Sequence, residues 1–169
     1  AVLEMSGEGI ELDRTIIEAI RDPLVHLVRN AVDHGLESPA ARAAAGKPEV
    51  GVIRLSAIQD GGHVIIEVAD DGGGIDPHRV AQSALDKKLI TQNDLASMTE
   101  SEMVDLVLLP GFSTASKVTK ISGRGVGMDV VRANITVLGG VVDIDSAPGR
   151  GTALTMTLPI TLAIIQALI

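Results

Sequence analysis

Two strand pairs with short links constrain the fold of this chain more than any other feature. Residues 52–58 and 63–69 are rich in β-branched side chains and flank an Asp-Gly-Gly sequence typical of a hairpin turn. Residues 142–145 and 154–158 alternate apolar and polar side chains around a Pro-Gly-Arg-Gly turn. Because hairpin links join antiparallel neighbours, these segments predict an antiparallel or mixed sheet.

Helix signals are segregated from the strands along the chain. Asp13 can cap a helical turn over 15–20, and Asp22-Pro23 predicts a new helix start, with the helix ending at Gly35. Thr99, with Glu102, forms a capping box. Further helical stretches are expected at 40–45, 77–89, 100–108 and 128–138. Such segregation predicts an α+β fold, a two-layer α/β sandwich with helices on one face of the sheet.

Charge and composition exclude several classes of function. The chain has 14 basic and 22 acidic residues, so its net charge of −8 and its lack of basic–aromatic patches argue against nucleic-acid binding. A polyanionic ligand would need a metal ion or a locally basic spot. Phe112 is the only aromatic residue, so a bound base would be held by aliphatic walls and hydrogen bonds. The absence of cysteine excludes disulfides and thiolate zinc sites and is compatible with a cytoplasmic location.

The first candidate site residues share one helix face. His26 and Asn30 are spaced i, i+4, and Asp33 or His34 continues the polar side of the same helix. An Asn carboxamide oxygen is a hard ligand that suits Mg²⁺, which completes its shell with water and phosphate. Taken alone, the pair is more typical of a solvated polar helix face than of a metal site.

A second candidate follows a strand directly. Asp70 ends the strand at 63–69 and is followed by Asp71 and three glycines, so the main chain can approach a ligand while the carboxylate accepts from a donor. A plain turn is the alternative. A calcium loop is rejected because the bidentate glutamate of an EF-hand is missing.

Two glycine-rich boxes lie nearer the C-terminus. Gly123, Gly125 and Gly127 precede the helix at Met128, where free N–H groups and the helix dipole would suit a phosphate. No preceding strand supports a dinucleotide fold, and no Gly-Lys-Ser/Thr supports a Walker loop. The segment 149–152 includes Thr152 and, read alone, is a β-turn.

The order of these boxes resembles the GHKL superfamily of ATPases and kinases, which has the Bergerat ATP-binding fold. Within it, the chain resembles the catalytic domain of the chemotaxis sensor histidine kinases, the CheA family. The resemblance covers nearly the whole chain and is carried by DPLVHLVRNAVDHGLE (22–37), VADDGGGID (68–76), LPGFSTASKV (109–118), SGRGVGMDVV (122–131) and GRGTALTMTLPITLAIIQ (149–166).

The resemblance implies a role for each box. Asp70 would accept the exocyclic amine of adenine with support from Thr152, Gly74 would pack against the ring, and Asn30 would hold Mg²⁺. His26 occupies the position of the catalytic Glu of hydrolytic members and would lie near the γ-phosphate. The remaining residues expected around ATP are Asp33, His34, Gly72, Ile75, Phe112, Ser113, Thr114, Lys117, Gly123, Arg124, Gly125, Val126, Gly127 and Met128, with 111–127 acting as a lid.

The implied activity is transfer of the γ-phosphate of Mg-ATP to a histidine on a separate phosphotransfer domain. None of the four histidines of this chain lies in an obvious acceptor motif. Residues 1–159 would form the catalytic domain, and the apolar run 160–169 would begin a linker to a receptor-coupling domain. Dimerisation would belong to another domain, so the fragment is expected to be a cytoplasmic monomer without membrane insertion. The alternatives are a GHKL ATPase and a nucleotide-gated module that binds without transfer.

Overall fold

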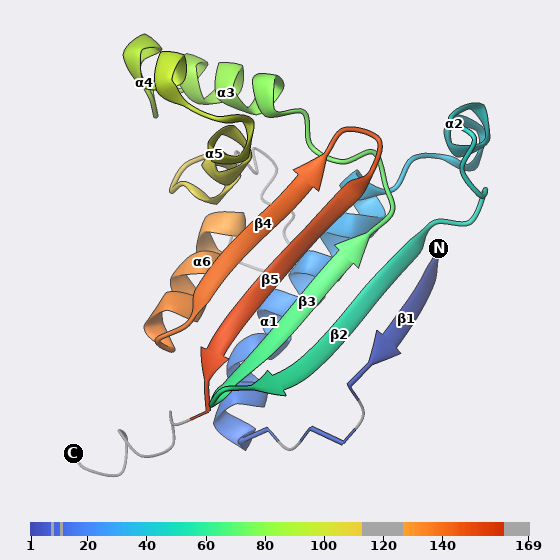
Figure 1. The fold of residues 1–169 in the computed structure, drawn as a ribbon, viewed down its shortest axis with the longest axis vertical. Helices are drawn as coiled ribbons and strands as arrows, with labels where there is room; N and C mark the ends of the chain where they lie inside the picture. The colour runs from blue at the N-terminus through green and yellow to red at the C-terminus, as the bar shows by residue number, and fades with distance from the viewer. Residues whose placement is uncertain (8, 11, 113–126, 161–169) are drawn as a thin grey trace, which may run out of the picture.

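A computed structural model of the chain describes residues 1–7, 9–10, 12–112 and 127–160. The sheet has the order β1-β2-β3-β5-β4 (Figure 1). The strands are β1 (Val2–Ser6), β2 (Val52–Asp60), β3 (His63–Asp70), β4 (Val141–Ala147) and β5 (Gly151–Pro159). β1 runs parallel to β2, and the other neighbouring strands are antiparallel. The predicted hairpins and the mixed sheet are therefore confirmed.

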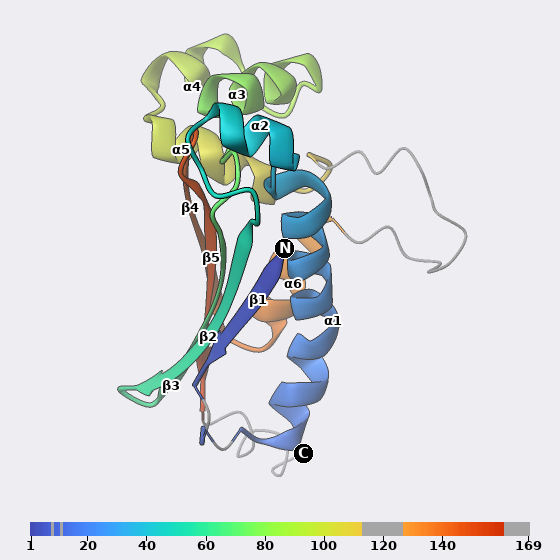
Figure 2. The same ribbon diagram turned by 90° about the vertical axis from the view of Figure 1, so that its right-hand side faces the viewer.

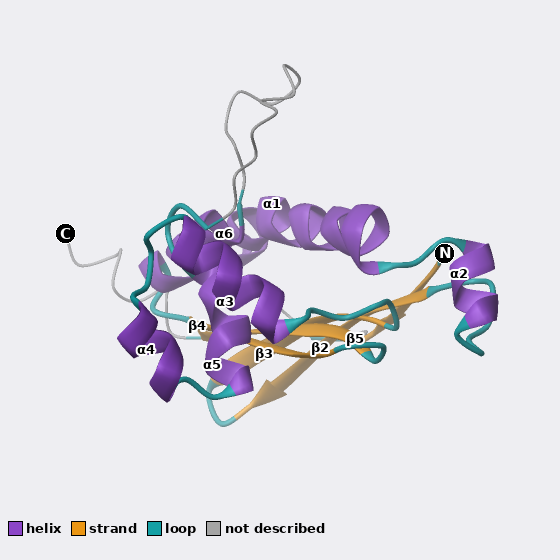
Figure 3. Cartoon of the chain, turned by 90° about the horizontal axis from the view of Figure 1, so that it is seen from above, coloured by secondary structure: helices purple, strands orange, loops and turns teal. Residues whose placement is uncertain are grey.

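Helices cover one face of this sheet, as the sequence predicts (Figures 2 and 3). α1 (Arg14–Asn30) and α6 (Met128–Val137) lie along that face, while α3 (Pro77–Asp86), α4 (Gln92–Ser97) and α5 (Glu100–Asp105) gather near one end of the sheet. The remaining elements are α2 (Pro39–Ala44), the π-helix η1 (Ala31–Gly35) and the 3₁₀-helix η2 (Leu106–Leu108). In the described part of the chain, no helix is both long enough and apolar enough to span a membrane.

The main core lies between the sheet and α1 and α6. Alternate residues of the strands point into it, because successive strand side chains point to opposite faces. These core strand residues are Ile53, Val64, Ile66, Val68, Val142, Ile144, Leu154, Met156 and Leu158. They meet Ile16, Ile20, Leu27, Val131 and Ile135 from the helices. A second cluster joins α3 to α5 around Ala81, Ala84 and Met103.

The prediction of a helix restart at Pro23 is wrong. α1 runs without a break from Arg14 to Asn30 with Pro23 inside it, although proline removes one helical hydrogen bond. Ile16, Ile20, Pro23 and Leu27 are all buried at spacings of four, three and four residues. This stripe is continuous across the proline, so packing against the sheet keeps both halves in one helix.

Caps fix the other helix ends largely as expected. Asp13 accepts from the Thr15 N–H, and Thr99 forms the predicted capping box with Glu102. The helix that ends at Gly35 differs, because its last turn is a π-helix in which Leu36 N–H donates to the Ala31 carbonyl at 2.9 Å. A π-turn inserts an extra residue into the helical repeat and is frequent at functional sites.

Candidate functional site

A row of polar side chains lies at one end of the apolar, helix-facing side of the sheet. Asp70 pairs with Thr152, and Thr152 pairs with Ser146, across the three strands β3, β5 and β4. Each of these residues lies two positions from a core residue of its strand and so points to the same face of the sheet. The core residues are Val68, Leu154 and Ile144. The helix-facing side of the sheet therefore changes from hydrocarbon to hydrogen-bonding groups within one step along the strands.

Asp70 is a half-buried carboxylate at this boundary. Its Oδ1 accepts from the Gly72 N–H at 2.9 Å. A Cβ on Gly35 would lie 2.9 Å from its Oδ2, so the glycine that ends η1 leaves room for the carboxylate. Burial raises the pKa of Asp70, the Gly72 and Thr152 backbone N–H groups oppose that rise, and the charges of Asp71 and Glu37 add to it.

Ser146 connects the polar row to the glycine loop, and no pattern in the sequence singles it out. Its hydroxyl donates to the Gly151 carbonyl at 2.9 Å and accepts from the Ile75 N–H at 2.9 Å. The Thr152 hydroxyl oxygen lies 2.9 Å from the Ser146 hydroxyl oxygen. Thr152 thus contacts Asp70 through strand pairing and a backbone N–H, while its hydroxyl is engaged with Ser146.

The glycines after Asp71 let this loop approach other parts of the backbone. Gly74 has φ +70°, and a Cβ on it would lie 2.0 Å from the Ala147 carbonyl oxygen. A Cβ on Gly72 would lie 2.0 Å from the carbonyl oxygen of Gly35. These two glycines are therefore required by close packing within the protein, in addition to any closeness to a ligand.

His26 and Asn30, one helical turn apart, meet Met128, which is distant in sequence. The Asn30 Nδ2 lies 2.9 Å from His26 Nε2 and 3.6 Å from Met128 Sδ. No hydrogen bond from the described residues occupies the Asn30 Oδ1. Met128 is the first residue of α6, and its N-cap, Gly127, has no side-chain cap. Tertiary packing thus brings the predicted metal-ligand amide beside the helix start predicted to bind phosphate.

The protonation state of His26 follows from this contact. Because the Asn30 amide nitrogen only donates, His26 Nε2 accepts, and a neutral ring then carries its proton on Nδ1. Burial lowers the pKa of His26, and the nearby Arg29 charge lowers it further. Both effects favour the neutral imidazole, with Nε2 engaged by the Asn30 amide.

Other predicted residues lie apart from these contacts. Asp33 and His34 are exposed on η1, and Asp33 borders an open groove between α1 and β2. Phe112 packs on the cluster of α3 and α5, with Lys87 Nζ 4.8 Å from its ring centroid and hydrogen-bonded to its carbonyl. The predictions for Ser113, Thr114, Lys117, Gly123, Arg124, Gly125 and Val126 lie outside the described residues.

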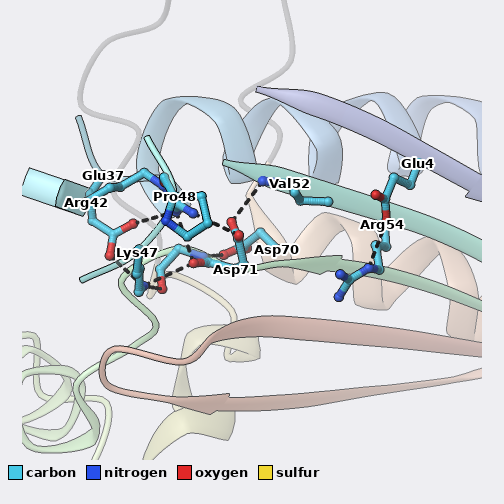
Figure 4. Close-up of polar contacts among 10 residues, drawn as sticks. Glu4, Glu37, Arg42, Lys47, Pro48, Val52, Arg54, Asp70 and Asp71 are labelled. Atoms are coloured by element: carbon cyan, nitrogen blue, oxygen red, sulfur yellow. Dashed lines mark hydrogen bonds and ion pairs between the residues drawn. The ribbon is translucent and has the colours of Figure 1, made fainter. Parts of the chain in front are cut away.

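A buried ionic cluster stands behind Asp70 and was missed by sequence reasoning (Figure 4). Arg42 of α2 is 1% exposed and donates to Asp71 Oδ2 at 2.8 Å, to Glu37 Oε2 at 3.1 Å and to the Pro48 carbonyl at 2.7 Å. Lys47 donates to Glu37 Oε1 at 2.7 Å. The sequence predicts only a short helical stretch at 40–45 here, and an arginine on such a helix is normally exposed.

The charges of this cluster are mutually stabilised. Burial raises the pKa of Asp71, but hydrogen bonds from the Val52 N–H and Arg42 outweigh it and leave the pKa below its ordinary value. The hydrogen bond from Lys47 is the main cause of a lowered pKa at Glu37. The cluster anchors the segment that begins with Asp71, directly after the half-buried carboxylate.

The chain is similar in sequence to chemotaxis proteins of known family. The chain is 52% identical over 164 residues to "Chemotaxis protein CheA" of Halobacterium salinarum, covering 97% of this chain and 25% of that protein. It is 47% identical to "Sensor histidine kinase CheAY" of Helicobacter pylori, covering 99% of this chain and 21% of that protein. The chain thus spans about a quarter of the length of these relatives.

Solved structures show the same fold. The catalytic domain of the histidine kinase ThkA superposes with a TM-score of 0.52 at 19% identity, covering 95% of this chain and 80% of that one. A histidine kinase domain of a blue-light activated kinase from Erythrobacter litoralis gives a TM-score of 0.54 at 15% identity, covering 94% and 54%. Residues 19–162 match the family described as "Histidine kinase-, DNA gyrase B-, and HSP90-like ATPase". The chain belongs to this ATPase family and is of the CheA-type histidine kinase kind.

Proposed function

We propose that this chain binds Mg-ATP and donates the γ-phosphate to a histidine on a separate phosphotransfer domain in chemotaxis signalling. One observation carries the proposal. Asp70 is a half-buried acceptor beside Gly35 at one end of η1, and Asn30 lies just before the other end, next to the start of α6. A hydrogen-bond acceptor for a base and a polar helix start for phosphates are thus separated by little more than one helical turn.

The donor set fits a hydrated magnesium ion held together with phosphates. Among the residues that the structure describes, no group of three or more His, Cys, Asp or Glu side chains is placed to hold a metal by itself. Asn30 offers one amide oxygen, and Mg²⁺ keeps several waters and takes its other ligands from phosphate. When bound, the ion would neutralise phosphate charge on a chain whose net charge is −8.

Each protein group then has a defined task. The Asp70 carboxylate accepts from the exocyclic amine of adenine, and its fixed geometry excludes bases without a donor there. The Asn30 amide nitrogen orients His26, and the Asn30 amide oxygen would be the protein ligand that holds Mg²⁺. The N–H groups at the start of α6 bind phosphate oxygens, because that end of a helix carries unpaired donors and the positive dipole.

Transfer is favoured over hydrolysis by the state of His26. A general base for water needs a free lone pair, whereas His26 Nε2 already accepts from Asn30. The pKa of His26 is also lowered, which weakens it as a base. A water molecule near the γ-phosphate would therefore not be activated by this side chain, and the phosphoryl group is left for the acceptor histidine.

The test combines the chain with a phosphotransfer domain from a CheA relative and γ-labelled ATP. We expect labelled phosphohistidine on the added domain, and no label when Asp70→Ala replaces the wild-type chain. Free phosphate without phosphohistidine would support the ATPase alternative. Nucleotide binding with neither product would support a binding module. As a control, Lys88→Met changes an exposed lysine away from the site and should label the added domain as the wild-type chain does.

A further inference from the structure

The peptide group between Asp71 and Gly72 is held on both sides. Its carbonyl oxygen accepts from Arg42 Nη1 at 3.1 Å and from Lys47 Nζ at 3.0 Å. Its N–H, which belongs to Gly72, donates to Asp70 Oδ1 at 2.9 Å. In a trans peptide the C=O and N–H point in opposite directions, so cations that fix the oxygen also fix the direction of the N–H.

Further contacts remove the freedom of this peptide to rotate. The Asp71 carboxylate accepts from Arg42 on one oxygen and from the Val52 N–H on the other, at 2.8 and 2.9 Å. Lys47 also reaches the Gly72 carbonyl at 2.7 Å. Both carbonyls of the turn after Asp70 are therefore held from the segment that contains α2 (Figure 4).

The cluster acts on Asp70 by orientation more than by charge. Two cations, Arg42 and Lys47, balance the two carboxylates of Asp71 and Glu37. Burial, and to a smaller extent those carboxylates, raise the pKa of Asp70, and the Gly72 N–H opposes the rise. A carbonyl that accepts from cations also polarises its own peptide, which strengthens the N–H as a donor.

We infer that Arg42 and Lys47 are positioning residues for base selection: they hold the Asp71–Gly72 peptide so that its N–H fixes the Asp70 carboxylate toward the base. This inference rests on the proposed function, in which Asp70 selects adenine. The α2 segment thereby sets how strongly the site distinguishes a 6-aminopurine from a purine without the amino group.

The first experiment uses Lys47→Met, because Lys47 is partly exposed and its removal leaves Arg42 in place. Calorimetric titrations compare ATP with purine riboside triphosphate, which lacks only the exocyclic amine. We expect the preference for ATP to fall about three- to tenfold, the range of one hydrogen bond, with affinity for the analogue nearly unchanged. Lys88→Met, an exposed lysine outside the cluster, should change neither value. Equal losses for both ligands, or an unchanged preference, would overturn the inference.

A charge-balanced variant separates orientation from simple electrostatics. In Lys47→Met/Glu37→Gln, the net charge near Asp70 returns to that of the wild type, but the Lys47 contacts to the Asp71 and Gly72 carbonyls remain absent. We expect the ATP preference to stay low. Recovery of the wild-type preference would show that only charge mattered and would overturn the positioning role.

A ligand-free measurement keeps this inference distinct from the proposed function. The Gly72 amide resonance should follow the ionisation of Asp70 in a pH titration of the wild-type chain. In Lys47→Met, we expect a smaller shift amplitude and a midpoint at higher pH, since the opposing N–H is then held only by the Arg42 contact to its peptide. A wild type that does not discriminate ATP from the analogue would refute adenine reading by Asp70. An unchanged Gly72 titration in Lys47→Met would refute the positioning role.

Discussion

Replacing Arg42 with methionine should lower the free energy of unfolding substantially, although Arg42 lies on a helix of only six residues. The guanidinium is 1% exposed, and its hydrogen bonds reach two carboxylates and two main-chain carbonyls. Methionine fills similar volume without a donor, so the acceptors are left behind. Leaving a buried ionic partner unpaired costs several kcal/mol.

The contacts that remain in Arg42→Met limit the expected loss in the free energy of unfolding. After the change, Glu37 and the Asp71 carbonyl still accept from Lys47, and Asp71 Oδ1 still accepts from Val52. The loss is concentrated on Asp71 Oδ2 and the Pro48 carbonyl, and the Asp71 side chain is 34% exposed, so water can reach it. We therefore expect a loss of about 2–3 kcal/mol, near the lower limit for a broken buried pair.

The loss of folding stability in Arg42→Met should be larger at neutral pH than in acid. The pKa of Asp71 is below its ordinary value in the folded chain, so its ionisation stabilises the fold above the ordinary aspartate pKa of about 4. That contribution disappears as the pH falls through the lowered folded-state pKa. The difference between wild type and Arg42→Met should thus be largest near neutral pH and shrink in acid.

Urea denaturation followed by far-ultraviolet circular dichroism is the assay, since the chain has no Trp or Tyr to report by fluorescence. Arg14→Met is the matched control, because its ion pair with Glu18 is exposed and should be worth less than about 0.5 kcal/mol. A cycle with Asp71→Asn measures the coupling directly. A loss in Arg42→Met no larger than in the control, or one independent of pH, would refute the reasoning.

Three further predictions concern the site itself. Asn30→Ala should abolish the Mg²⁺ dependence of ATP affinity, and overlapping Mg²⁺ titrations of variant and wild type would contradict the ligand role. Asp70→Asn should raise the ligand-free stability at neutral pH, because the raised pKa of Asp70 means that its ionisation disfavours folding. This gain in stability should vanish in acid, and urea denaturation curves at both pH values check it. Gly74→Ala should cost about 2 kcal/mol or more, because φ is +70° and the new Cβ would meet the Ala147 carbonyl; a thermal midpoint equal to that of the wild type would contradict it.

Local patterns in the sequence determined the strands, most caps and the layer arrangement. The alternation of Leu154, Met156 and Leu158 with threonines is a property of period two, which any half-buried strand must show. Capping by Asp13 and Thr99 depends on side chains within three residues of the helix start. Each of these features is local, so neither needed knowledge of distant contacts.

The chemistry of the site was predictable to the extent that it depends on residue type. Asp70 at a strand end and Asn30 on a polar helix face were selected because few side chains accept from a base or suit Mg²⁺. Their roles remain predictions. Their placement beside Gly35 and Met128 required the fold, since Asn30 and Met128 are 98 residues apart.

Tertiary packing alone decided the features that contradict or extend the sequence patterns. Pro23 lies inside one continuous helix, because burial along a single stripe outweighs a local preference to begin a new helix there. Arg42 is buried because Glu37 and Asp71, on either side of β2 in sequence, surround it in space. Burial of an arginine depends on partners from distant segments, and a short polar helix carries no local signal that those partners exist.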